Sequence, residues 1–264
     1  MSRSKDKIAF LTKHPYCCLC GGDVASDSVE HSPPRALFVD RDAKGAFRFP
    51  ACNRCNCGSR ENDQVAALAS LIMGAATASH VPNSYVEKLL QGVANNSPDF
   101  IRMIGAVQSP ELLRINGLVR EVFPVNMDSQ IYPRWLLPWA AKLSLAFWYH
   151  HTHKILNSEG RIFVHWISNA DSQDNQEFFE QIQKALPGNN HVKQGKVEYP
   201  NQFRYLYGIS DDSDFGSFGF ILHESAFIWA GIFENRARID AFRGMPIYKT
   251  SAEEGIELDS FPIR

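Results

Sequence analysis

All six cysteines of this chain lie in one short segment, and this clustering constrains the fold more than any other feature. They fall within residues 17–57, while residues 58–264 contain none. The segment holds two Cys-x-x-Cys pairs: Cys17 with Cys20, and Cys52 with Cys55. Cysteines with this spacing are typical ligands of a structural Zn²⁺ ion, which stabilises a small fold with little core of its own. The pattern therefore predicts a tetrahedral zinc site near the start of the chain.

A framework of disulfide bonds is the alternative explanation for clustered cysteines. Disulfides suit secreted proteins, but no apolar stretch like that of a signal peptide follows the N-terminal sequence Met-Ser-Arg-Ser-Lys-Asp-Lys. We therefore expect a cytoplasmic protein, in which thiols stay reduced and two such pairs favour zinc over disulfides. Cys18 could replace a neighbouring ligand or simply pack, and we expect both Cys18 and Cys57 to be bystanders.

The segment between the cysteine pairs carries polar side chains suited to catalysis. Glu30 and His31 precede Ser32-Pro33-Pro34, and Asn56 directly follows the second pair. His31 titrates near neutrality and can act as a base, while the oxygens of Glu30 and Asn56 suit a hard cation such as Mg²⁺. Adjacent residues of a strand point to opposite faces, so Glu30 and His31 can work together only if the strand bulges or twists.

The same segment is expected to form a hairpin that leads into a helix. Phe47 and Phe49 alternate with smaller or polar residues and predict a strand that ends at Cys52, after a turn near residues 42–45. Beyond Cys55 the apolar residues recur at helical spacing. Several basic side chains of the hairpin could contact phosphates, although a solvated surface is the alternative for each: Arg35, Arg41, Lys44 and Arg48.

Three motifs together resemble the HNH endonuclease family, whose ββα-metal finger often carries flanking zinc pairs. They are Cys17-x-x-Cys20-Gly21, Glu30-His31-x-x-Pro34 and Cys52-x-x-Cys55-Asn56, and the likeness covers residues 1–65. The resemblance implies that His31 is the general base and that Glu30 and Asn56 hold Mg²⁺ or another divalent cation. It implies hydrolysis of phosphodiester bonds in DNA, with RNA not excluded.

The chain departs from the family's pattern at two points. Glu30 stands where Asp is commoner, and the family's middle asparagine has no clear counterpart within residues 35–50. Asn53 and Asp63 are candidates for supporting roles near the site. A zinc-stabilised module that binds nucleic acid or protein without cutting it is the alternative function, and it would need the same cysteines but not His31.

Beyond residue 65 the sequence indicates structure more than chemistry. Apolar periodicity predicts helices over 64–79, 83–93, 133–151 and 174–186, and strands over 118–125, 161–167, 202–207, 218–222 and 227–233. These segments indicate an α+β unit with a mainly antiparallel sheet. Its alternating aromatic residues could stack on exposed bases but are more often core. Target selection, oligomerisation and regulation are the candidate roles of this unit, through a second copy of the chain or another partner.

The sequence thus predicts an α+β protein with a zinc-stapled ββα finger over residues 1–65 and a helical and α+β unit over 66–264. No membrane span is expected, because the apolar stretch 135–149 is interrupted by Pro138, Lys142 and Ser144. The net charge of −2 argues against a protein that coats nucleic acid without sequence specificity, because such proteins are usually strongly basic. By analogy with the family, a nuclease of this kind would serve bacterial defence or a mobile element.

Overall fold

The computed structural model describes most of the chain in several stretches. These are residues 3–22, 24–39, 47–73, 81–105, 111–115, 118–122, 131–157, 159–168, 189–191, 193–194, 197–198, 201–224, 226–234 and 256–257. The predicted helix over 174–186, the predicted turn at 42–45, and with them Arg41 and Lys44, lie outside the described residues.

The N-terminal part of the chain is built on a short antiparallel hairpin. Helix α1 (Arg3–Lys13) is followed by strand β1 (Ser28–His31), the short 3-10 helix η1 (Arg35–Leu37) and strand β2 (Arg48–Ala51). Strands β1 and β2 pair in a regular antiparallel register that sets Glu30 opposite Phe49 and His31 opposite Arg48. Helix α2 (Asn53–Gly58) begins directly after β2 and leads into α3 (Arg60–Met73).

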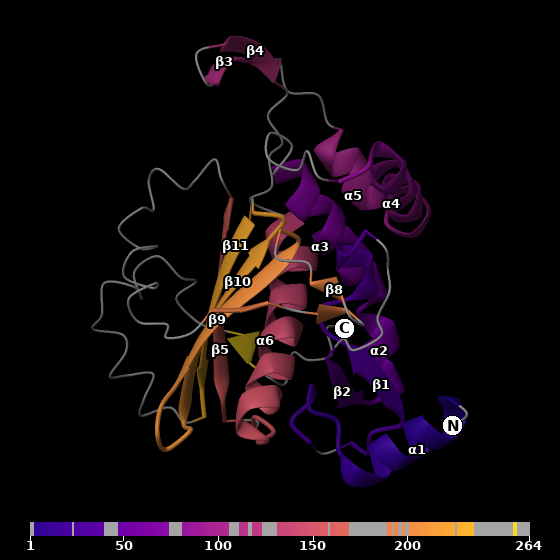
Figure 1. Ribbon diagram of the computed structural model, residues 1–264, viewed down its shortest axis with the longest axis vertical. Helices are drawn as coiled ribbons and strands as arrows, with labels where there is room; N and C mark the ends of the chain where they lie inside the picture. The colour runs from indigo at the N-terminus through magenta and orange to yellow at the C-terminus, as the bar shows by residue number, and fades with distance from the viewer. Residues whose placement is uncertain are drawn as a thin grey trace.

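Two further helices and a second hairpin follow. Helices α4 (Asn83–Asn96) and α5 (Pro98–Ile104) lie beside one end of α3, and the predicted helix over 83–93 is confirmed by α4 (Figure 1). Strands β3 (Glu111–Ile115) and β4 (Leu118–Val122) form an antiparallel pair at one end of the molecule.

The later part of the chain forms a six-stranded antiparallel sheet. Its strand order is β12-β5-β11-β10-β9-β6, and every neighbouring pair is antiparallel. The strands are β5 (Arg161–Ser168), β6 (Asn189–His191), β9 (Phe203–Ile209), β10 (Phe215–Leu222), β11 (Ala226–Phe233) and β12 (Ile256–Glu257). A small separate pair joins β7 (Lys193–Gln194) to β8 (Val197–Glu198). The predicted α+β class with a mainly antiparallel sheet is confirmed.

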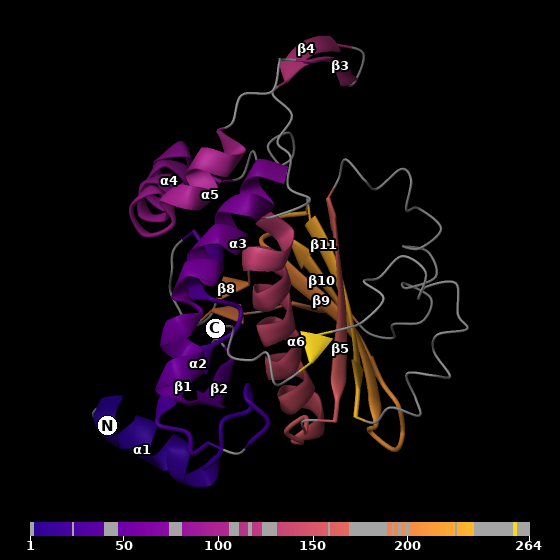
Figure 2. The ribbon, with the colours of Figure 1, turned by 180° about the vertical axis from the view of Figure 1, so that it is seen from behind.

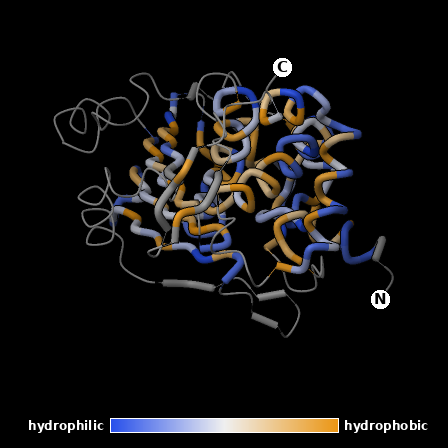
Figure 3. Tube along the Cα trace, turned by 90° about the horizontal axis from the view of Figure 1, so that it is seen from above, coloured by the Kyte–Doolittle hydropathy of each residue, from blue (hydrophilic) through white to orange (hydrophobic). Residues whose placement is uncertain are grey.

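Helix α6 (Leu137–Thr152) lies between this sheet and the N-terminal elements (Figures 1 and 2). It continues from a π-helical turn, η2 (Tyr132–Leu136), and every residue from Pro138 to Trp148 is buried. A helix that is apolar on all sides must be covered on all sides, which explains its central place. Hydrophobic segments accordingly gather inside the molecule, as the colouring in Figure 3 shows.

Aromatic rings on both sides of α6 join the two layers into one core. The ring of Phe147 on α6 lies 5.2 Å from that of Phe47 beside β2, and 4.5 Å and 5.3 Å from those of Tyr205 and Phe220 in the sheet. Tyr205 and Phe220 are buried, so the interpretation of the sheet aromatics as core is confirmed. The predicted boundary at residue 65 falls within α3, and the division of the chain there stays a prediction.

In the described part of the chain, no helix is both long enough and apolar enough to cross a bilayer. The interruption of the apolar stretch at Lys142 has a structural explanation, because this lysine is buried in α6 and paired with carboxylates.

Replacing Phe147 by Ala should destabilise the protein by about 3–5 kcal/mol, because the side chain is fully buried and the cavity would lie between two layers. Chemical denaturation followed by circular dichroism measures this loss. Leu112→Ala is the control, since Leu112 is 74% exposed on β3 and should change stability little. Equal losses for the two variants would contradict the central place of Phe147.

Candidate metal centre and its surroundings

Two of the four clustered cysteines sit on a tight turn between α1 and β1. Cys17 and Cys20 flank Cys18 and Leu19, and the chain then turns through Gly21 and Gly22, whose φ angles are +78° and +84°. Glycine adopts this left-handed conformation without strain. The backbone N–H of Cys18 donates to the carbonyl of Pro50 (3.0 Å), which fastens this turn to β2.

The other two cysteines lie at the start of α2. Cys52 is the residue before the helix and Cys55 lies in its first turn. The carboxylate of Asp27 accepts hydrogen bonds from the backbone N–H of Asn53 (2.6 Å) and from its side chain (3.1 Å), and so fixes where α2 begins. The positive end of a helix dipole favours thiolates at such a position.

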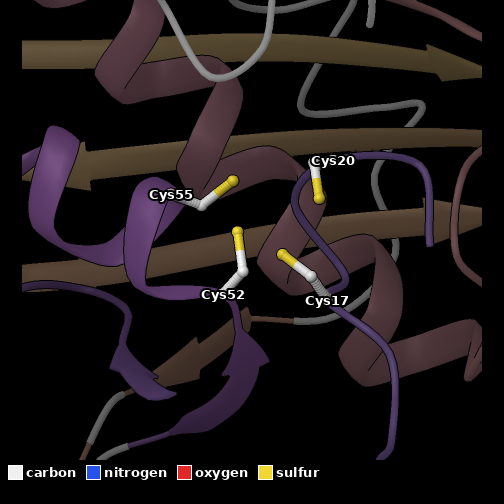
Figure 4. A group of neighbouring side chains, drawn as sticks. All are labelled: Cys17, Cys20, Cys52 and Cys55. Atoms are coloured by element: carbon white, nitrogen blue, oxygen red, sulfur yellow. The ribbon is translucent and has the colours of Figure 1, made fainter. Parts of the chain in front are cut away.

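The four sulfur atoms converge on one point (Figure 4). They lie within 4.8 Å of one another, and none of the six cysteines is in a disulfide bond. A tetrahedral zinc site with Zn–S bonds of about 2.3 Å needs sulfurs about 3.8 Å apart, so a small contraction would complete it. This group, the cysteine cluster, could hold a metal ion such as zinc. Cys18 is buried and Cys57 exposed, and neither belongs to the group.

Hydrogen bonds within the cysteine cluster change the pKa values of its thiols in opposite directions. Hydrogen bonds from Cys20 and Cys55 lower the pKa of Cys17 to about 2, and the backbone N–H of Leu19 also donates to its sulfur (3.4 Å). The pKa of Cys20 is raised to about 12 and that of Cys55 is also raised, chiefly because Cys17 is their hydrogen-bond partner. Without a metal ion, Cys20 and Cys55 therefore stay protonated, and a divalent cation would be needed to deprotonate them.

His31 lies on β1 in a cationic setting. The pKa of its imidazole is lowered to about 4, first by burial and then by Arg35 and Arg48. An Arg35 guanidinium nitrogen lies 3.5 Å from Nε2. A guanidinium only donates, so Nε2 can take part in this contact only as an acceptor. Nδ1 is buried and has no hydrogen-bond partner among the described residues. His31 is therefore neutral at pH 7.

Glu30 points to the other face of β1 and pairs with a lysine. Its carboxylate lies 3.2 Å from Nζ of Lys142 on α6, which also contacts Asp63 Oδ1 (2.6 Å) and Ser59 Oγ (2.9 Å). We refer to these four residues as the Lys142 cluster. Burial raises the pKa of Glu30 to about 7 against the opposing pull of Lys142, and Asp63 adds to the rise. The regular pairing of β1 keeps Glu30 and His31 on opposite faces.

Asn56 is also engaged by protein groups. Its side-chain amide donates hydrogen bonds to the hydroxyl of Ser28 and to the carbonyl of Val29 (3.1 Å), and so ties α2 to β1. As they lie here, Glu30 and Asn56 do not form an open cation site, because the Glu30 carboxylate already contacts an ammonium group. Their assignment as ligands of a divalent cation stays a prediction.

The predicted phosphate-contacting residues are placed as follows. Arg35 is exposed, whereas Arg48 forms an ion pair with Asp6 (2.7 Å) and stacks over the ring of Phe10. Of the residues missed by the motif analysis, Lys142 and Ser59 matter most. An isolated lysine within an apolar run is the signal that could have revealed Lys142.

Comparisons with protein-family models, with curated proteins and with solved structures found no match to this chain.

Replacing Cys52 by Ser should remove the metal and lower the free energy of unfolding by several kcal/mol, because zinc-binding energy is folding energy in such sites. Metal analysis of the purified protein and thermal unfolding check both effects. Cys57→Ser is the matched control and should keep metal content and stability, since Cys57 is exposed and outside the cysteine cluster. Full metal content in the Cys52→Ser protein would rule out this ligand set.

Removing the charge of Arg35 should raise the pKa of His31. The imidazolium form is disfavoured by burial, Arg35 and Arg48, so Arg35→Gln should give a rise on the order of one pH unit while burial keeps the pKa below its ordinary value. NMR titration measures it, with the His31 signal identified by its loss in His31→Asn. Arg102→Gln, in a separate ion pair with Asp99, should leave the pKa unchanged.

Proposed function

We propose that this chain is a metal-dependent endonuclease of the HNH type that hydrolyses phosphodiester bonds in DNA. The observation that carries the proposal is the setting of His31, a neutral imidazole beside Arg35 and Arg48 on a hairpin next to the cysteine cluster. A base and two cations on one short hairpin are what attack on a phosphodiester requires.

His31 becomes a better base when a phosphate binds. With a pKa of about 4 the imidazole is unprotonated at neutral pH but is a weak proton acceptor. A phosphate group paired with Arg35 would offset the charge that disfavours the imidazolium, and would draw the guanidinium away from Nε2. The pKa of His31 would then rise towards neutrality in the complex, where Nε2 takes a proton from the attacking water.

Zinc in the cysteine cluster would be structural. Four thiolates fill a tetrahedral coordination sphere and leave no position for water or substrate. Its role would be to hold the turn at Cys17 and Cys20 against the start of α2. This would also fix the start of β1 and the end of β2, which follow the turn and precede α2. The dependence on a second, divalent cation and the preference for DNA come from the family resemblance alone.

A second candidate is a zinc-stabilised module that binds nucleic acid or protein without cutting. The observation that favours it is the pairing of Glu30 with Lys142, together with the use of the Asn56 amide to fasten β1. The two candidates differ in their dependence on His31, since only cutting needs a base.

His31→Ala should reduce nicking of a supercoiled plasmid in Mg²⁺ by about a hundredfold or more, the usual contribution of a general base. Gel electrophoresis with and without EDTA measures the rate. His153→Asn is the matched control, because His153 is an exposed histidine with φ +57° at the end of α6, a conformation that Asn tolerates.

Undiminished nicking by the His31→Ala protein would eliminate the proposed mechanism. DNA binding without nicking by the wild-type protein, with equal affinity in the variant, would instead establish the noncatalytic module.

A further inference from the structure

Lys142 is the single charged residue in the run of buried residues from Pro138 to Trp148 of α6. Its ammonium donates to oxygens of three residues, Glu30, Ser59 and Asp63, and so uses all three of its hydrogens. The side chains of Lys142 and Glu30 are 3% and 4% exposed. The contacts thus form a closed, desolvated site rather than a surface ion pair.

The oxygens around Lys142 are of the kind that a hard divalent cation prefers. Two carboxylate oxygens and a hydroxyl oxygen, from β1, α3 and the residue between α2 and α3, converge on one positive charge. With both carboxylates ionised, a single ammonium leaves the Lys142 cluster one negative charge in excess. A divalent ion would balance both carboxylates, but it cannot bind beside a fixed ammonium.

The Lys142 side chain is closely surrounded by buried residues. The residues on either side of Lys142 in the helix, Ala141 and Leu143, are fully buried, as is Trp139 one turn away. The lysine side chain is therefore confined between α6, β1 and α3, and its position depends on how α6 packs against the hairpin.

We propose that Lys142 is a built-in cation that occupies the place of a divalent metal ion at Glu30 and so weakens the binding of that ion by the nuclease. This inference rests on the proposed function in one respect, the role of Glu30 as a metal ligand. Metal loading then requires α6 to withdraw the ammonium. Since α6 also packs on the six-stranded sheet, a change at the sheet would be transmitted to Glu30 through this lysine.

Binding of Mn²⁺ to the zinc-loaded full chain, followed by electron paramagnetic resonance, tests the proposal without reference to cutting. Wild-type protein and Glu30→Gln should bind Mn²⁺ equally weakly, because Lys142 blocks the carboxylate. Lys142→Met should bind it about tenfold or more tighter. The added Glu30→Gln change should abolish that gain.

Lys154→Met is the matched control, because Lys154 pairs with Glu234 in a partly exposed ion pair away from the Lys142 cluster. It should bind Mn²⁺ as the wild type does. Tighter Mn²⁺ binding by wild type than by Glu30→Gln would overturn the proposal, as would a folded Lys142→Met protein with no gain. If Lys142→Met does not fold, Lys142→Gln is measured in its place, and tighter binding by wild type than by Glu30→Gln still overturns the proposal.

Plasmid nicking separates this proposal from the proposed function. Lys142→Met should nick at lower Mn²⁺ concentrations than wild type. Mn²⁺ binding that follows the expected pattern without nicking by any of the proteins would refute the nuclease but leave Lys142 as the blocking cation.

Discussion

The burial of α6 on every side is the constraint on which the rest of the structure depends. Its residues from Pro138 to Trp148 are apolar except for Lys142 and Ser144, so the helix must be covered by one layer on each side. The sheet supplies one layer, and the N-terminal hairpin with α3 supplies the other. The part of the chain that carries the cysteine cluster is thereby held in a fixed relation to the sheet.

Two different interactions position the hairpin. The cysteine cluster acts within the N-terminal segment, where it joins the turn after α1 to the start of α2. The Lys142 cluster acts between layers and fixes β1 against α6. A buried ion pair of this kind loses much of its Coulomb energy to desolvation, so it links β1 to α6 without necessarily adding much to the free energy of unfolding.

Features with a local sequence signal were predictable, and those that depend on long-range packing were not. The Cys-x-x-Cys pairs, the strands now seen as β5, β10 and β11, and helix α4 all follow from spacing and periodicity within short windows. The contact between Lys142 and Glu30 joins residues 112 positions apart, and no local pattern encodes it. The opposite orientation of Glu30 and His31 followed from strand alternation, but the partners of each side chain did not.

Because side chains alternate along β1, Glu30 and His31 lie on opposite faces and contact different charged groups. Burial, together with the charges of Arg35 and Arg48, keeps the imidazole of His31 neutral, whereas Glu30 faces α6 and contacts the ammonium of Lys142. In the proposed nuclease, bound substrate would raise the pKa of His31 on one face of the strand. The packing of α6 would decide whether Glu30, on the other face, can bind a metal ion. Cutting would require both, and the sheet-bearing part of the chain would then regulate the chemistry of the hairpin.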